Sequence, residues 1–163
     1  MSKPIVLSDH SDRLRVMNEV VTVLVSGKQT GGKYAVFESI TQPKDGVPLL
    51  HTHPHQETFQ VVEGTYQIFG QDGEGNKTAT LAPAGSIVHV PGGAPHGFLN
   101  VGDTPGKLVL TVEPASMEGF FRDLGTPIDD ASGLATSSGP PDMEEVLETC
   151  AKHGVHFLEA PPQ

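Results

Sequence analysis

A regular succession of short β-branched and aromatic runs sets the fold class expected for this chain. Nineteen glycines and fourteen prolines divide the chain into these runs. Short strands about ten residues apart, with turn residues between them, are typical of an all-β sandwich or barrel. No helical periodicity appears before Ser116. The expected strands are Glu19–Ser26, Lys33–Ile40, Leu49–His53, Glu57–Val62, Thr65–Phe69, Thr78–Leu81, Ser86–Val90, Pro95–Val101 and Lys107–Glu113.

The pattern changes after Pro114. Met117–Leu124 is predicted to be a short helix that packs its apolar side chains on the β-structure. Thr126–Pro141 is rich in Ser, Thr, Gly, Pro and Asp and is predicted to be a loop. A second helix is expected to begin at Asp142, whose side chain can cap it, and to end at Gly154. Its apolar face would consist of Met143, Val146, Leu147, Cys150 and Ala151.

The length and composition predict a single globular domain. With 163 residues, 36% of them hydrophobic and 18% charged, the chain can bury a core. We expect one domain over residues 1–163, with a barrel core at about 14–115 and a helical extension at about 116–163. No apolar run approaches the roughly 20 residues of a membrane helix. The N-terminus lacks the apolar segment of a secretory signal, and the single Cys150 cannot form an internal disulfide, so we expect a cytoplasmic protein.

The charge of the chain limits its partners. The formal net charge is −10 and the pI is about 5.1. An acidic surface without a Lys/Arg cluster repels phosphate groups, so neither nucleic acid nor an anionic membrane is an expected partner.

Three histidines and a glutamate have the spacing of a metal site. His51, His53 and Glu57 stand in the run HTHPHQE, and His96 follows 39 residues after the glutamate. On a strand, two residues at i and i+2 share a face and lie about 6.6 Å apart, so His51 and His53 can bind one ion. Imidazole and carboxylate together suit a divalent first-row transition metal. His96 would reach the same ion from a neighbouring strand.

Glu57 can join this site only if the chain turns. A straight strand would place it roughly 20 Å from His51. Pro54 cannot donate a ladder hydrogen bond and would interrupt the strand. His55 lies in this turn. It could be a substitute ligand, a residue that supports a ligand, or a solvated histidine, and we favour the solvated histidine. The remaining histidines are expected to be structural, interface or solvated residues: His10, His89, His153 and His156.

The arrangement of these residues resembles the two motifs of the cupin superfamily. The first motif corresponds to Gly46, His51, His53, Glu57 and Gly64. The second corresponds to Gly85, Pro91, Gly93, His96 and Asn100. One departure is that four residues, rather than the usual five, separate Gly46 from His51.

The resemblance implies a single small jelly-roll barrel with a metal inside one end. It implies His51, His53, Glu57 and His96 as the ligands of one divalent ion per chain, which could be Fe, Mn, Ni, Cu or Zn. It also implies a homodimer. The segment Gly119–Pro127 is similar to the one that closes small cupins related to quercetin dioxygenase.

Residue parity predicts the lining of a pocket beside the metal. If His96 and Glu57 point inward, Phe98, Phe59 and Val61 do so too. With His55 at its border, this pocket would be largely apolar and would suit a small molecule with a polar group on the ion. The alternative is that Phe59, Val61 and Phe98 are ordinary core residues. No Arg or Lys near the motifs could pair with a phosphate, which argues against a sugar-phosphate isomerase.

Three functions follow from these features, in decreasing order of preference. The first is a dioxygenase-like enzyme for a small aromatic or enolisable substrate, in which Glu57 is both ligand and proton acceptor. The second is a non-oxidative metal enzyme, such as an isomerase, decarboxylase or lyase. The third is a binding protein for a small molecule or a metal, without catalysis.

Overall fold

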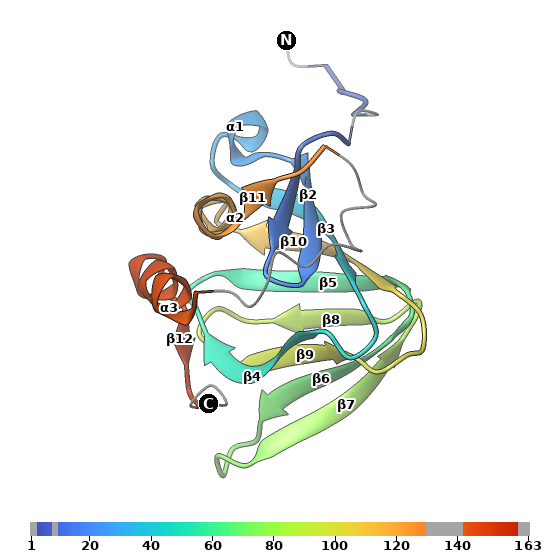
Figure 1. Cartoon of the computed structure of the whole chain (residues 1–163), viewed down its shortest axis with the longest axis vertical. Helices are drawn as coiled ribbons and strands as arrows, with labels where there is room; N and C mark the ends of the chain where they lie inside the picture. The colour runs from blue at the N-terminus through green and yellow to red at the C-terminus, as the bar shows by residue number, and fades with distance from the viewer. Residues whose placement is uncertain (1–2, 8–9, 130–141, 160–163) are drawn as a thin grey trace.

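Two antiparallel sheets face each other in the structure (Figure 1). The structure is a computed structural model that describes residues 3–7, 10–129 and 142–159. In spatial order, the strands of the seven-stranded sheet are β11 (Thr126–Pro127), β1 (Arg13–Val16), β2 (Glu19–Val25), β3 (Ala35–Thr41), β10 (Gly106–Glu113), β5 (Gln56–Glu63) and β8 (Ile87–Val90). Those of the five-stranded sheet are β12 (His156–Phe157), β4 (Gly46–Thr52), β9 (His96–Asn100), β6 (Thr65–Gln71) and β7 (Lys77–Pro83).

This arrangement confirms the expected all-β, jelly-roll fold. Each of the nine expected runs coincides with a strand, with bounds that differ by a few residues. The two sheets form a sandwich and do not join into one closed barrel. The core between them contains side chains from both sheets, among them Phe37, Phe59, Tyr66 and Leu108.

Four short elements were not anticipated. The helix α1 (Gly27–Thr30) contradicts the expectation of no helix before Ser116. It is a single turn, too short to show a helical period, and ends at Gly31 with φ 65°. The strands β1, β11 and β12 were also missed. The strand β11 falls within the predicted loop and is only two residues long, because it forms solely by pairing with β1.

Asn100 fixes one end of the sandwich by hydrogen bonds. Its Nδ2 donates to the carbonyl oxygens of Thr41 at 3.1 Å and Thr104 at 3.0 Å, and its Oδ1 accepts from the Gly102 N–H at 2.9 Å. Thr41 also bonds the buried Tyr66 hydroxyl through its side chain, at 2.5 Å. Asn100 is therefore a structural residue of the turn.

Two helices cover one end of the sandwich, beside β12 (Figure 1). In α2 (Met117–Leu124), Phe121 packs edge-on against Phe37, with ring centroids 4.9 Å apart. The second helix, α3 (Met143–Lys152), begins as predicted at Asp142, whose side chain accepts from the N–H groups of Glu144 and Glu145.

Only part of the expected apolar face of α3 docks on α2, because Met143, Leu147 and Ala151 are exposed. Val146 and Cys150 are buried against Phe120 and Leu124 of α2. Among the described residues, no helix is long and apolar enough to cross a membrane.

Candidate metal centre

Two of the predicted ligands face each other on neighbouring strands. His51 on β4 is directly paired with His96 on β9, and their ring centroids are 4.3 Å apart. The Nδ1 of His51 lies 3.0 Å from the Leu49 carbonyl oxygen, and that of His96 lies 2.9 Å from the Ala94 carbonyl oxygen. These bonds assign the proton to Nδ1 in each ring, because a carbonyl only accepts. Each Nε2 is then left with a free lone pair, as metal binding requires.

The chain turns between His53 and Glu57, as the spacing required. The strand β4 ends at Thr52, residues 54–55 form a bend, and β5 begins at Gln56 in the opposite sheet. Glu57 therefore approaches the histidines from the facing sheet, and the four side chains join the two layers at one end of the sandwich.

The turn of the second motif supports this bend. Gly92 packs so closely on the Pro54 carbonyl oxygen that a Cβ atom there would collide with it. Gly93, with φ 80°, donates its N–H to the His53 carbonyl oxygen at 2.8 Å. The two glycines thus allow the loop to hold the backbone between two candidate ligands.

The donor atoms of the cluster converge on one point. The ring nitrogens of His51, His53 and His96 all lie within 4.8 Å of one another. The two carboxylate oxygens of Glu57 lie 3.4 Å from His53 Nε2 and 3.6 Å from His96 Nε2. Ligand atoms about 2.1 Å from one ion are separated by about 3–4 Å, so this donor set fits a single transition metal.

Burial favours the neutral form of His51 and His53. It lowers the pKa of His51 to about 4, with a further contribution from the neighbouring His96. Burial also lowers the pKa of His53, although Glu57 opposes this effect. Neutral imidazole is the form that binds a metal.

Glu57 is held in the opposite charge state. Burial alone would raise the pKa of its carboxyl group, but the polar surroundings formed by His96, His53 and His51 outweigh burial and leave this pKa below its usual range. The cluster thus offers imidazole nitrogens together with an ionised carboxylate.

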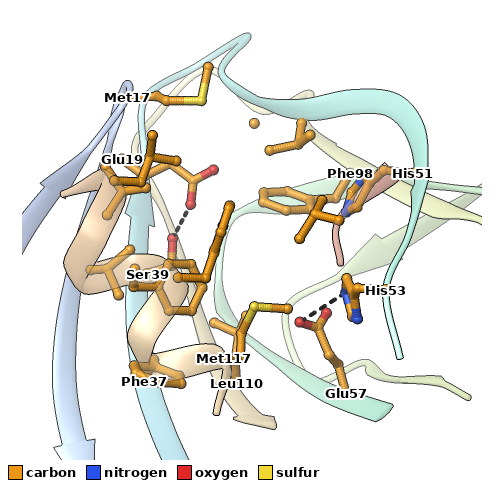
Figure 2. Close-up of a pocket in the computed structure, with 18 of the residues that line it drawn as sticks. Met17, Glu19, Phe37, Ser39, His51, His53, Glu57, Phe98, Leu110 and Met117 are labelled. Carbon is orange, nitrogen blue, oxygen red and sulfur yellow. Dashed lines mark hydrogen bonds and ion pairs between the residues drawn. The ribbon is translucent and has the colours of Figure 1, made fainter. Parts of the chain in front are cut away.

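The cluster forms one wall of a pocket between the sheets and the helices (Figure 2). Phe59 and Phe98 line this pocket, as predicted, together with further aromatic and aliphatic side chains such as Phe37 and Leu110. Val61 does not line it and is a buried core residue. The polar side chains of the lining are concentrated at the cluster and at one other place, formed by Asn18, Glu19 and Ser39.

His55 is not the solvated turn histidine that we favoured. Only 5% of it is exposed, and its Nε2 lies 2.8 Å from the Ser116 hydroxyl oxygen. It does not line the pocket. His55 is buried because the start of α2 covers the turn. This contact joins residues 61 positions apart, so the sequence around His55 does not indicate it.

Sequence reasoning missed the part of the pocket that comes from the C-terminal segment. Phe157 on β12 pairs with His51 on β4, and the two rings are 5.8 Å apart. Val146, Cys150 and Val155 line the same wall. The apolar face of α3 was recognised in the sequence, but nothing local shows that this face borders the metal cluster.

Sequence reasoning also missed Glu19 and Ser39. Both face the pocket from the larger sheet. In the run EVVTVLV, apolar residues occupy both parities, so the sequence does not show which face of β2 points inward.

Comparison with known proteins agrees with this fold. The cupin domain family model matches residues 37–112. Quercetin 2,3-dioxygenase of Aspergillus japonicus is 23% identical over 125 residues, which cover 76% of this chain and 35% of that protein. The chain therefore spans about a third of the length of this curated relative.

Solved structures show the same fold. An RmlC-like cupin from Shewanella frigidimarina is 18% identical, with a TM-score of 0.57 over 72% of this chain and 96% of that one. A protein with a double-stranded β-helix domain from Klebsiella pneumoniae is 23% identical, with a TM-score of 0.52 over 71% of this chain and 92% of that one. With both motifs in place at the end of a jelly-roll sandwich, the chain contains a cupin domain over residues 37–112.

Proposed function

We propose that this protein is a metal-dependent, dioxygenase-like enzyme that acts on a small aromatic or enolisable substrate. The observation that carries the proposal is the convergence of three histidines and a glutamate on the wall of a largely apolar pocket. A structural metal site is usually closed by its ligands, whereas a catalytic one keeps a position open to substrate. Four protein donors leave two positions on an octahedral ion.

His51, His53, Glu57 and His96 would hold one divalent transition metal per chain. The mixture of imidazole and carboxylate suits Fe, Mn, Ni, Cu or Zn. When bound, a redox-active ion supplies a Lewis acid for a substrate oxygen and a route for electrons to dioxygen.

The pocket selects the shape of the substrate. Its aromatic and aliphatic walls favour a flat, apolar body, with a polar group directed at the cluster. Phe98 is one such apolar wall residue, since it shares the inward face of β9 with His96 and lies beside His51 in the pocket (Figure 2). These walls also exclude water from the reacting group.

Glu57 would accept a proton from the substrate. Its carboxyl group has a pKa below the usual range and is therefore ionised at neutral pH. One of its oxygens could receive the proton of an acidic enol or phenol hydroxyl while the other stays on its ligand position.

The curated relative gives this proposal its reaction class. Its name states a quercetin 2,3-dioxygenase, and quercetin is an enolisable aromatic compound with the chemistry that this pocket favours. Because the match covers 35% of that protein, its substrate and activity reach this chain only as a proposal.

Oxygen uptake tests the proposal directly. The protein is reconstituted separately with Fe, Mn, Ni, Cu and Zn, and oxygen consumption is followed with 3-hydroxyflavone and with a 1,3-diketone. We expect uptake of one O2 per substrate consumed with at least one redox-active metal. His96→Ala should abolish it. His89→Ala is the matched control, because His89 is exposed on β8 and bonds only the Thr58 side chain among the described residues.

Other results would select a different function. Substrate conversion that proceeds equally without oxygen, above all with zinc, would support an isomerase, decarboxylase or lyase. If the protein binds the ligand tightly but does not convert it with any of the metals, it would be a binding protein.

A further inference from the structure

The pocket contains a second polar site away from the candidate metal ligands. Glu19 is the first residue of β2, directly after the hairpin turn Met17–Asn18. It shares the inward face of the strand with Val21 and Val23 of the core. A glutamate at an inward position is costly to bury unless its carboxyl group finds a polar partner.

Ser39 is that partner. It lies on β3, and its hydroxyl donates to Glu19 Oε2 at 2.5 Å. This is the one hydrogen bond that the Glu19 carboxyl makes with the described residues. The remaining oxygen is free to bond a molecule in the pocket.

The Glu19 carboxyl group faces the metal-ligand cluster across the pocket. Figure 2 shows it pointing inward from the opposite side to His51 and His53. Apolar side chains, including Phe98 and Leu110, line the space between the two polar sites. A ligand that spans this space would carry one polar group at each end of an apolar body.

The charges around Glu19 define which polar group it accepts. Burial raises the pKa of Glu19 to about 7, the Ser39 hydrogen bond opposes this, and the acidic Asp45 and Glu57 add to it. Near neutral pH the carboxyl group can therefore either donate or accept a hydrogen bond. A hydroxyl group can match it in both states, since a hydroxyl both donates and accepts.

We infer that Glu19 is a specificity-determining residue that, oriented by Ser39, binds a hydroxyl group at the end of the substrate far from the metal ligands. This inference rests on the proposed function, which places the other polar group of the substrate at the metal ligands. A substrate without that hydroxyl would leave the second carboxyl oxygen of Glu19 without a partner in the pocket. A substrate with a carboxylate there would meet the negative charges of Glu19, Asp45 and Glu57.

A matched pair of ligands tests the inference. 3-Hydroxyflavone and 3,4′-dihydroxyflavone differ only by a hydroxyl on the distal ring. Their dissociation constants for the metal-loaded protein are measured anaerobically by calorimetry, which excludes turnover. We expect the dihydroxy compound to bind about five- to tenfold more tightly, the size of one hydrogen bond in an enclosed site. In Glu19→Leu this ratio should fall to about one.

Two further variants keep the result interpretable. Glu38→Leu is the matched control, because Glu38 lies on the outward face of β3 beside Lys107 and should leave the ratio unchanged. Glu19→Gln preserves the size of the side chain and removes its charge, so it should improve the affinity for the 4′-carboxylate of 3-hydroxyflavone. Circular dichroism establishes that each variant is folded.

The outcomes separate this inference from the proposed function. Equal affinity of the wild-type protein for both flavones, or a ratio that survives in Glu19→Leu, would overturn the role of Glu19 and leave the oxygen chemistry untouched. Failure of the wild-type protein to bind either flavone would overturn both the substrate class and the inference.

Discussion

Replacing Glu19 by glutamine should stabilise the protein at alkaline pH and have little effect at acidic pH. In the folded protein the pKa of Glu19 rises from 4.5 to about 7, chiefly because the carboxyl group is buried. In the unfolded chain the pKa returns to its ordinary value. The folded state therefore binds the proton more tightly than the unfolded state, and stability falls as the pH rises from about 4.5 through 7.

The pKa shift sets the size of the effect. A difference of about 2.5 pH units corresponds to about 3 kcal/mol at full burial, since each unit is worth about 1.4 kcal/mol. Glu19 is only partly buried as a residue, and solvent screening reduces the effect, so we expect about half of it. For a chain of this length, about 1.5 kcal/mol raises the melting temperature by about 3–6 °C.

Thermal unfolding at a series of pH values measures this change. The Tm of Glu19→Gln should exceed that of the wild-type protein at pH 8, and the two should approach each other near pH 5, where Glu19 is protonated. The control is Glu38→Gln, which alters a partly exposed ion pair with Lys107 and should shift Tm little at either pH. A Glu19→Gln protein that is no more stable than wild type at pH 8 would show that the carboxyl group is better solvated than its position implies.

Four other perturbations follow from the structure. His96→Ala should reduce the metal content from close to one ion per chain to a small fraction of that value, whereas His89→Ala should not, as elemental analysis of the purified proteins can show. Gly92→Ala should place a Cβ against the Pro54 carbonyl and destabilise the protein by about 1–3 kcal/mol, measured by urea unfolding. Asp142→Ala removes the cap of α3 and should cost about 1 kcal/mol in the same assay, with no change in metal content. Chelation should lower Tm, because free metal at 100 times its dissociation constant stabilises the folded state by about 2.7 kcal/mol.

The strands could be predicted from the sequence, and the candidate metal ligands could be singled out, because their signals are local. The runs between glycines and prolines mark the strands through side-chain preference. The two-residue spacing of His51 and His53 places them on one side of a strand, and Pro54 marks the point where the strand must stop. The capped start of α3 at Asp142 is another local signal, and the structure confirms it.

Short paired elements could not be predicted in the same way. The strands β11 and β12 contain two residues each and have no pattern of their own. They exist because β1 and β4 offer free edges with unpaired backbone groups. Only the packed chain brings these edges within reach.

The sequence by itself determined the fold class, the turn between His53 and Glu57 and the identity of the candidate ligands, since each follows from short local patterns of residues. The tertiary structure decided the rest of the pocket. The burial of His55 depends on Ser116, the polar site of Glu19 depends on the inward face of β2, and the wall at Phe157 depends on how the C-terminal segment docks. These features arise from contacts between distant segments, which no local pattern of side chains encodes.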